Sequence, residues 1–156
     1  MKRFMMVLMA AVLVLAAGTA MAATATSVFA VSATVQPTCS ISTGATAIAF
    51  GTYDPLSATP LDGSGTVSFR CTRNTLYWTY IPGPWTIAGP VPADVLSMNF
   101  YSDAAYTALY STGKVGGGTA SPNNAPQTVT YYGRIPANQY VAEGAYSQNF
   151  TFTVEY

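Results

Sequence analysis

The chain has 156 residues, of which 50% are hydrophobic and only 8% are charged, with six basic residues, six acidic residues and no histidine. So few cations exclude nucleic-acid binding, which needs several clustered basic side chains to hold a phosphate backbone. Without histidine the chain has no Ser–His or Cys–His catalytic pair, and its two cysteines alone cannot assemble a zinc site.

Residues 1–22 have the pattern of a secretory signal peptide. Lys2 and Arg3 give a positively charged start, an apolar run follows, and Ala20-Met-Ala22 is a small-x-small cleavage site. The alternative is a membrane anchor, but the apolar run is shorter than the roughly 20 residues that span a bilayer. We therefore expect a mature chain that begins at Ala23, forms one domain and carries a formal net charge of −2.

Residues 23–36 are expected to form an extension ahead of the domain. Over residues 28–35 apolar side chains alternate with small or polar ones, the period of a β-strand. The apolar face consists of Phe29, Val31, Ala33 and Val35. Pro37 cannot donate to a strand ladder, so it separates this segment from the domain expected over residues 37–156. Because no hairpin partner lies beside it, the segment is predicted to pair with another subunit.

Cys39 and Cys71 are the two cysteines of the chain. A signal peptide directs them to an oxidising compartment, so one disulfide is expected, with a pair of free thiols as the alternative. Closing a loop of about 33 residues would stabilise the fold by roughly 3 to 4 kcal/mol in the chain-entropy model. In the strand predicted over residues 66–72, Cys71 shares a face with Val67 and Phe69 and is expected to point into the core.

The rest of the chain alternates apolar and polar residues and has no convincing helical period, which predicts an all-β sandwich of about seven short strands. Further strands are expected around Ile48 and Phe50, over 75–81, from Leu96 to Phe100, at 107–110 and over 129–135. The segments between them are expected to be irregular: a loop over 54–63, a stretch over 82–92 in which prolines break regular pairing, and a long flexible loop over 116–124.

The last seven residues have the clearest strand pattern. Their apolar members are Phe150, Phe152, Val154 and Tyr156. Because the sequence still has an apolar residue at its end, we expect Tyr156 to face inward and this strand to lie deep in the sheet. Such a strand needs a partner, and residues 28–35 of a neighbouring subunit are the candidate.

The chemistry-bearing residues predict no enzyme, no metal site and no cofactor. The six acids of the mature chain sit singly, mostly in expected turns, which favours solvated carboxylates over the paired carboxylates of a glycosidase. The glycines at 116–118 are not a phosphate loop, because neither a Lys-Ser/Thr pair nor a helix start follows them.

Four aromatic residues lie in or beside the proline-rich stretch: Tyr77, Trp78, Tyr80 and Trp85. Packing in the core or in a subunit interface is the commoner role of such residues. Stacking of exposed rings on a sugar or an apolar surface is the alternative, and it would make the chain a sugar-binding adhesin domain.

Four motifs carry a resemblance to a known family: Asn99-Phe-Tyr-Ser-Asp-Ala-Ala105, Tyr131-Tyr-Gly-Arg-Ile-Pro-Ala137, Gly144-Ala-Tyr-Ser147 and Phe150-Thr-Phe-Thr-Val-Glu-Tyr156. They resemble the spore coat protein U domain, a family that includes the subunits of archaic chaperone–usher pili. The leading segment 29–35 and both cysteines fit as well, so the resemblance covers essentially the whole mature chain. It departs from the family over residues 73–93, which are richer in proline and tryptophan.

The resemblance implies that residues 37–156 form an incomplete immunoglobulin-like sandwich that lacks its final strand. In such pilins a periplasmic chaperone lends a strand to the open groove, and the N-terminal extension of the next subunit later replaces it. The donor residues would then be Phe29, Val31, Ala33 and Val35, and the acceptor-groove strand would carry Phe150, Phe152, Val154 and Tyr156.

The implied function is that of a structural pilin, secreted through the periplasm to an extracellular pilus that supports adhesion and biofilm formation. Its implied partners are the chaperone, an outer-membrane usher and copies of itself or of related pilins, with no nucleic acid and no small-molecule cofactor. A secreted spore-coat or matrix protein of the same fold is the alternative.

Overall fold

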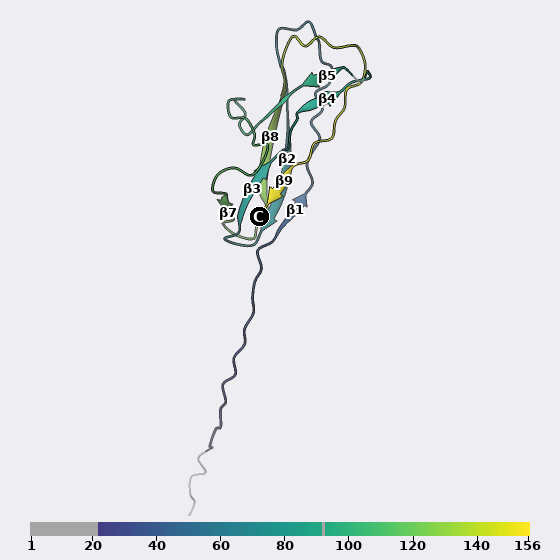
Figure 1. The fold of residues 1–156 in the computed structure, drawn as a ribbon. Helices are drawn as coiled ribbons and strands as arrows, with labels where there is room; N and C mark the ends of the chain where they lie inside the picture. The colour runs from purple at the N-terminus through teal and green to yellow at the C-terminus, as the bar shows by residue number, and fades with distance from the viewer. Residues whose placement is uncertain (1–21, 92) are drawn as a thin grey trace, which may run out of the picture. The chain divides into compact units, whose positions relative to one another are not determined.

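A computed structural model describes residues 22–91 and 93–156 (Figure 1). The predicted signal peptide lies outside the described residues except for its last position. The chain divides into two units at Thr34 and Val35, close to the end predicted for the extension. Residues 22–34 form neither helix nor strand, and Phe29 and Val31 are 86% and 83% exposed. The strand expected over residues 28–35 is therefore not formed within a single copy of the chain.

All regular elements of the described part are β-strands. They are β1 (Cys39–Thr43), β2 (Leu61–Cys71), β3 (Leu76–Tyr80), β4 (Thr86–Ala88), β5 (Val95–Ser97), β6 (Asn99–Tyr101), β7 (Thr119–Ala120), β8 (Gln127–Ile135) and β9 (Thr153–Glu155). They form three antiparallel sheets with the orders β1-β2-β8-β6, β7-β3-β9 and β4-β5. The all-β prediction is confirmed, and the arrangement agrees with an immunoglobulin-like sandwich. Nowhere in the described segments is there a helix long and apolar enough to cross a membrane.

The longest ladder joins β2 and β8 in continuous register from Leu61↔Ile135 to Phe69↔Gln127. Along β2, Val67, Phe69 and Cys71 alternate toward the core and are buried, as the sequence predicts. The predicted loop over 54–63 extends too far, because β2 already begins at Leu61.

The core lies between the sheets. Its buried side chains are Val67, Ile81, Ile87, Leu96, Met98, Phe100, Tyr110, Tyr131 and Ile135. The predicted inward alternation of Leu96, Met98 and Phe100 is confirmed. Leu96 lies in β5 of the two-stranded sheet and Phe100 in β6 of the four-stranded sheet, so the chain passes from one sheet to another at Met98.

Two segments predicted to be irregular contain strands. The proline-rich stretch includes β4, which fits between Pro84 and Pro90 and pairs with β5. The glycine-rich loop over 116–124 includes β7, which pairs with β3. Conversely, residues 107–110 form only a single bridge, between Leu109 and Tyr101. Partners distant in sequence therefore decide these short segments, and local composition does not reveal them.

The predicted disulfide joins Cys39 and Cys71, which are directly paired positions of β1 and β2. Their Cα atoms are 4.0 Å apart. The bond ties the first strand of the domain to the longest one, and no cysteine of the described chain is free.

We expect alkylation of the folded, secreted protein without reductant to modify neither cysteine, because both sulfurs are bonded to each other. The double variant Cys39→Ala/Cys71→Ala should lose roughly 3 to 4 kcal/mol of unfolding free energy, since its unfolded chain is no longer cross-linked. Intact mass spectrometry and urea unfolding measure the two effects. Two alkylated thiols in folded protein would contradict the bond.

Candidate functional site

The second unit contains a largely apolar groove with a volume of about 1210 Å³. One wall is formed by residues 45–56, and the other by residues 140–152. Figure 1 shows both segments as long stretches without strand arrows, one blue-grey and one yellow. The floor consists of core side chains: Ile81, Ile87, Leu96, Met98, Phe100, Tyr131 and Ile135. The groove therefore gives access to the hydrophobic core along its length.

The first wall alternates like a strand. Ile48 and Phe50 are half-buried and pack against the core, whereas Ala47 and Ala49 are exposed. The predicted alternation is present, but the wall is not a strand, so the strand expected here is wrong.

The first wall is fixed near its two ends. At one end the Thr46 amide donates to the Thr66 carbonyl at 2.9 Å, and the Tyr131 hydroxyl donates to the Thr46 carbonyl. At the other end the Tyr53 hydroxyl donates to the Pro136 carbonyl at 2.9 Å. The middle of the wall is held to the domain by side-chain packing.

Two glycines allow this wall to approach the sheet closely. Gly63 of β2 and Gly133 of β8 face each other in the ladder. A Cβ atom on Gly63 would lie 2.5 Å from the Ile48 side chain, and one on Gly133 would lie 2.9 Å from the Phe50 ring. Both positions must therefore lack a side chain for Ile48 and Phe50 to lie on the sheet.

The second wall packs through two aromatic rings. The Phe150 ring lies edge-on to Phe100 at 5.1 Å, and the Phe152 ring lies 6.1 Å from Tyr131. Both side chains face inward, as predicted. At Ser147 the wall is joined to the domain by one backbone hydrogen bond, from the Ser147 amide to the Ala88 carbonyl at 3.0 Å.

The end of the chain differs from the prediction. Only Thr153–Glu155 form a strand, and this strand, β9, is the last in the order β7-β3-β9 and so lies at the edge of its sheet. Val154 is half-buried, but Tyr156 is 54% exposed and lies beyond the strand. The expectations of an inward-facing Tyr156 and of a strand deep in the sheet are therefore wrong, because β9 has a ladder partner on one side only.

The two walls share one property. Within the described residues, neither 47–53 nor 148–152 makes a backbone–backbone hydrogen bond. Their backbones therefore present donors and acceptors that a further extended strand could satisfy. A strand placed between them would pair on both sides and cover the apolar floor.

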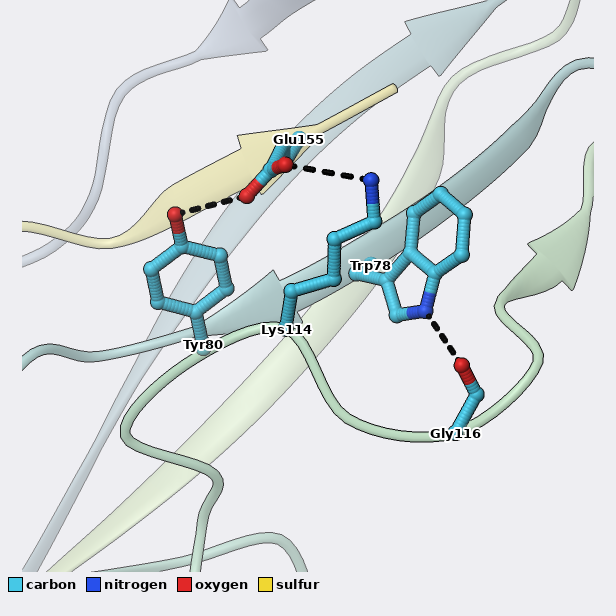
Figure 2. A network of polar contacts seen from close by, with 5 residues as sticks. All are labelled: Trp78, Tyr80, Lys114, Gly116 and Glu155. Atoms are coloured by element: carbon cyan, nitrogen blue, oxygen red, sulfur yellow. Dashed lines mark hydrogen bonds and ion pairs between the residues drawn. The ribbon is translucent and has the colours of Figure 1, made fainter.

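A polar cluster fastens the strand that continues the second wall (Figure 2). The Glu155 carboxylate accepts one hydrogen bond from the Tyr80 hydroxyl at 3.0 Å and one from the Lys114 ammonium at 3.1 Å. The ammonium also lies 3.9 Å from the Trp78 ring centroid, and the Trp78 indole donates to the Gly116 carbonyl at 3.0 Å. The bond from Lys114 and then that from Tyr80 lower the pKa of Glu155.

The four aromatic residues in or beside the proline-rich stretch all contact other residues of the domain. The Tyr77 hydroxyl donates to Gln127 at 2.7 Å, and the Trp85 ring lies edge-on to Phe100 at 5.6 Å. Trp78 has Lys114 against its ring, and Gly118 approaches it so closely that a Cβ there would lie 2.8 Å from the ring. This packing favours a structural role over stacking on a sugar.

Two of the acidic residues have partners within the domain. Asp62 forms two hydrogen bonds with Arg134, at 2.6 and 2.8 Å, and Asp103 accepts backbone hydrogen bonds from Thr107 and Ala108 within one turn. The Ala108 bond is the main cause that lowers the pKa of Asp103. In residues 22–91 and 93–156 no group of three or more metal-ligating side chains occurs.

Comparison with known proteins shows the family of the chain. Residues 25–153 match the family model of the Spore Coat Protein U domain. The chain is also 34% identical to Protein U of Myxococcus xanthus, an alignment that covers 86% of this chain and 87% of that protein. The chain therefore belongs to the spore coat protein U domain family and is a structural protein of the spore-coat or pilus type.

Proposed function

We propose that this protein is a pilin subunit that polymerises by donor-strand complementation. Residues 23–36 of one copy insert as a strand into the groove of another copy and complete its sandwich. The observation that carries the proposal is the pair of strand-like walls, 47–53 and 148–152, that lack a backbone partner on either side of an apolar floor. The groove residues of the second wall would be Phe150 and Phe152, whereas Val154 and Tyr156, also expected in the acceptor strand, do not line the groove.

The extension has the chemistry of the missing strand. Phe29, Val31 and Val35 are 86%, 83% and 78% exposed, and with Ala33 they occupy alternate positions. Full burial of each larger apolar side chain would contribute roughly 1.5 to 3 kcal/mol. A row of such side chains, together with ladders to both walls, makes a junction that is hard to reverse.

The lengths also agree. Residues 24–35 fully extended would span about 40 Å at roughly 3.3 Å per residue. The first wall, residues 45–56, has a similar number of residues, so the extension could run along the whole groove. The boundary at Thr34 and Val35 places Phe29, Val31 and Ala33 in a unit separate from the domain, as a donor segment requires.

The assembly route follows from family similarity. Periplasmic secretion, capture by a chaperone, passage through an outer-membrane usher and a pilus that supports adhesion and biofilm formation are the properties that we propose by analogy with archaic chaperone–usher pilins. A spore-coat or matrix protein that assembles by the same strand exchange is the second candidate, and the match to the Spore Coat Protein U domain model favours it. Chaperone and usher genes beside the gene of this protein would separate the two.

The unmodified mature chain is expected to self-associate, because each copy offers both an apolar strand and a groove that accepts it. A copy of residues 24–35 appended after Tyr156 through a flexible linker should fill the groove in cis and yield a soluble monomer with cooperative unfolding. Analytical ultracentrifugation and thermal melting measure both states. A stable monomer of the unmodified mature chain would contradict strand exchange.

Substitution within the donor face should abolish polymerisation. Phe29→Asp or Val31→Asp would place a carboxylate in the apolar groove without a partner, and its desolvation costs more than the lost apolar burial. Ser32→Asp, on the opposite face of the same strand, is the matched control and should assemble nearly normally. SDS-resistant ladders on unheated gels and electron microscopy of fibres report assembly. Normal fibres from Phe29→Asp, or equal loss from Ser32→Asp, would rule out this register.

A further inference from the structure

The second wall of the groove is positioned by its two ends. Residues 148–152 make no backbone–backbone hydrogen bond within the described chain. Just before them in the chain, the Ser147 amide donates a single hydrogen bond to the Ala88 carbonyl. Just after them, β9 begins at Thr153. Besides the packing of the Phe150 and Phe152 rings, the position of the wall therefore depends on how firmly β9 is held.

The backbone alone holds β9 by a short ladder. Its three residues pair with Trp78, Thr79 and Tyr80 of β3, and its other edge has no partner in the described chain. A strand of this length at a sheet edge frays readily unless side chains secure it.

Side chains of β3 and of the loop before β7 secure β9 at Glu155. Trp78 lies directly opposite Glu155 in the ladder, and Tyr80 lies two positions along the same face. The two carboxylate oxygens have different partners, the Tyr80 hydroxyl on β3 and the Lys114 ammonium on the loop that precedes β7. Figure 2 shows Glu155 between these two side chains.

The Lys114 loop is itself seated on β3. Its Gly116 carbonyl accepts the Trp78 indole hydrogen bond, and its Gly118 has a φ of 73° and approaches the Trp78 ring more closely than a residue with a Cβ could. These contacts place the ammonium group of Lys114 beside both the Trp78 ring and Glu155.

We propose that Glu155 is a positioning residue of the groove: by joining Tyr80 and Lys114, it keeps β9 in register on β3 and so holds the second wall at the spacing that an incoming strand requires. A strand that pairs with both walls must lie about 4.8 Å from each of them. A small displacement of Phe150 and Phe152 would therefore break one of the two ladders. This inference rests on the proposed strand exchange.

The ion pair between Lys114 and Glu155 should affect strand binding more than it affects the unfolding free energy of the domain. The side chains of Lys114 and Glu155 are 44% and 41% exposed, and ion pairs of this exposure contribute little to the unfolding free energy. The ion pair between Arg134 and Asp62, with side chains 29% and 36% exposed, is similar in chemistry but joins β8 to β2. It offers a matched control away from β9.

The test uses the mature chain with Val31→Asp, which cannot donate its own strand, and a fluorescent peptide of residues 24–35 as the probe. Adding Glu155→Gln or Lys114→Met should weaken peptide binding about three- to fivefold, the range that a partly exposed ion pair supports. Lys114→Arg should retain most of the affinity. Asp62→Asn should change the affinity by less than about twofold. It should nevertheless lower the urea midpoint about as much as Glu155→Gln does, because the two ion pairs are similar in chemistry.

Acid dependence gives a second readout. Because Lys114 and Tyr80 hold the pKa of Glu155 below its ordinary 4.5, the carboxylate contributes fully above that pH, and its contribution is lost as the pH falls through the lowered pKa. Peptide binding to the Val31→Asp chain should weaken over this range. The loss should be smaller in Glu155→Gln, whose side chain does not titrate.

The outcomes separate the two proposals. If the Val31→Asp chain does not bind the peptide at all, strand exchange itself is wrong. If it binds, but Glu155→Gln binds equally well, or Asp62→Asn weakens binding as much, the positioning role of Glu155 is overturned. Should Glu155→Gln fail to fold, Lys114→Met, which leaves every residue of β9 unchanged, decides the question in the same way.

Discussion

The domain contains two backbone segments whose hydrogen-bonding groups have no partner strand, and the proposed assembly depends on them. Residues 47–50 and 149–152 both alternate as strands do, yet no described strand pairs with them. Leaving such polar groups without partners is costly once they are shielded from water, and so is leaving the apolar wall side chains, such as Ile48, Phe50 and Phe150, only partly buried. One added strand removes both costs at once. This constraint is the physical basis of the strand exchange that we propose.

The remaining structure keeps that gap open and in shape. The ladder between β2 and β8 forms a rigid base, and the disulfide fastens β1 to β2. The facing glycines Gly63 and Gly133 allow the first wall to lie on the sheet. Aromatic rings of the second wall reach across the core to Phe100 and Tyr131. The groove is therefore a consequence of packing on both sides, and it does not require a flexible loop to open.

Sequence patterns predicted the elements whose burial is set locally. The inward face of β2 and the alternation through Met98 follow from a period of two, and the disulfide follows from the two cysteines and the predicted secretion. Patterns failed where a distant partner decides, as in β4 and β7 and at Tyr156. The contact between Lys114 and Glu155 joins positions 41 residues apart, and neither residue is marked by its neighbours in sequence. From the sequence, the groove could be predicted only in the sense that some strands lacked a partner. Alternation shows which side chains face inward, but it does not show which backbone groups are paired.

The central claim is that the strand in the groove comes from another copy, and crosslinking between copies tests it most directly. A light copy carrying a photoreactive phenylalanine analogue at position 29 would be assembled with a copy labelled with heavy isotopes, and the crosslinked peptides would be identified by mass spectrometry. The account predicts crosslinks from position 29 of the light copy to residues 45–56 or 140–152 of the heavy copy. Crosslinks within a single copy only, or to residues outside the groove, would contradict it.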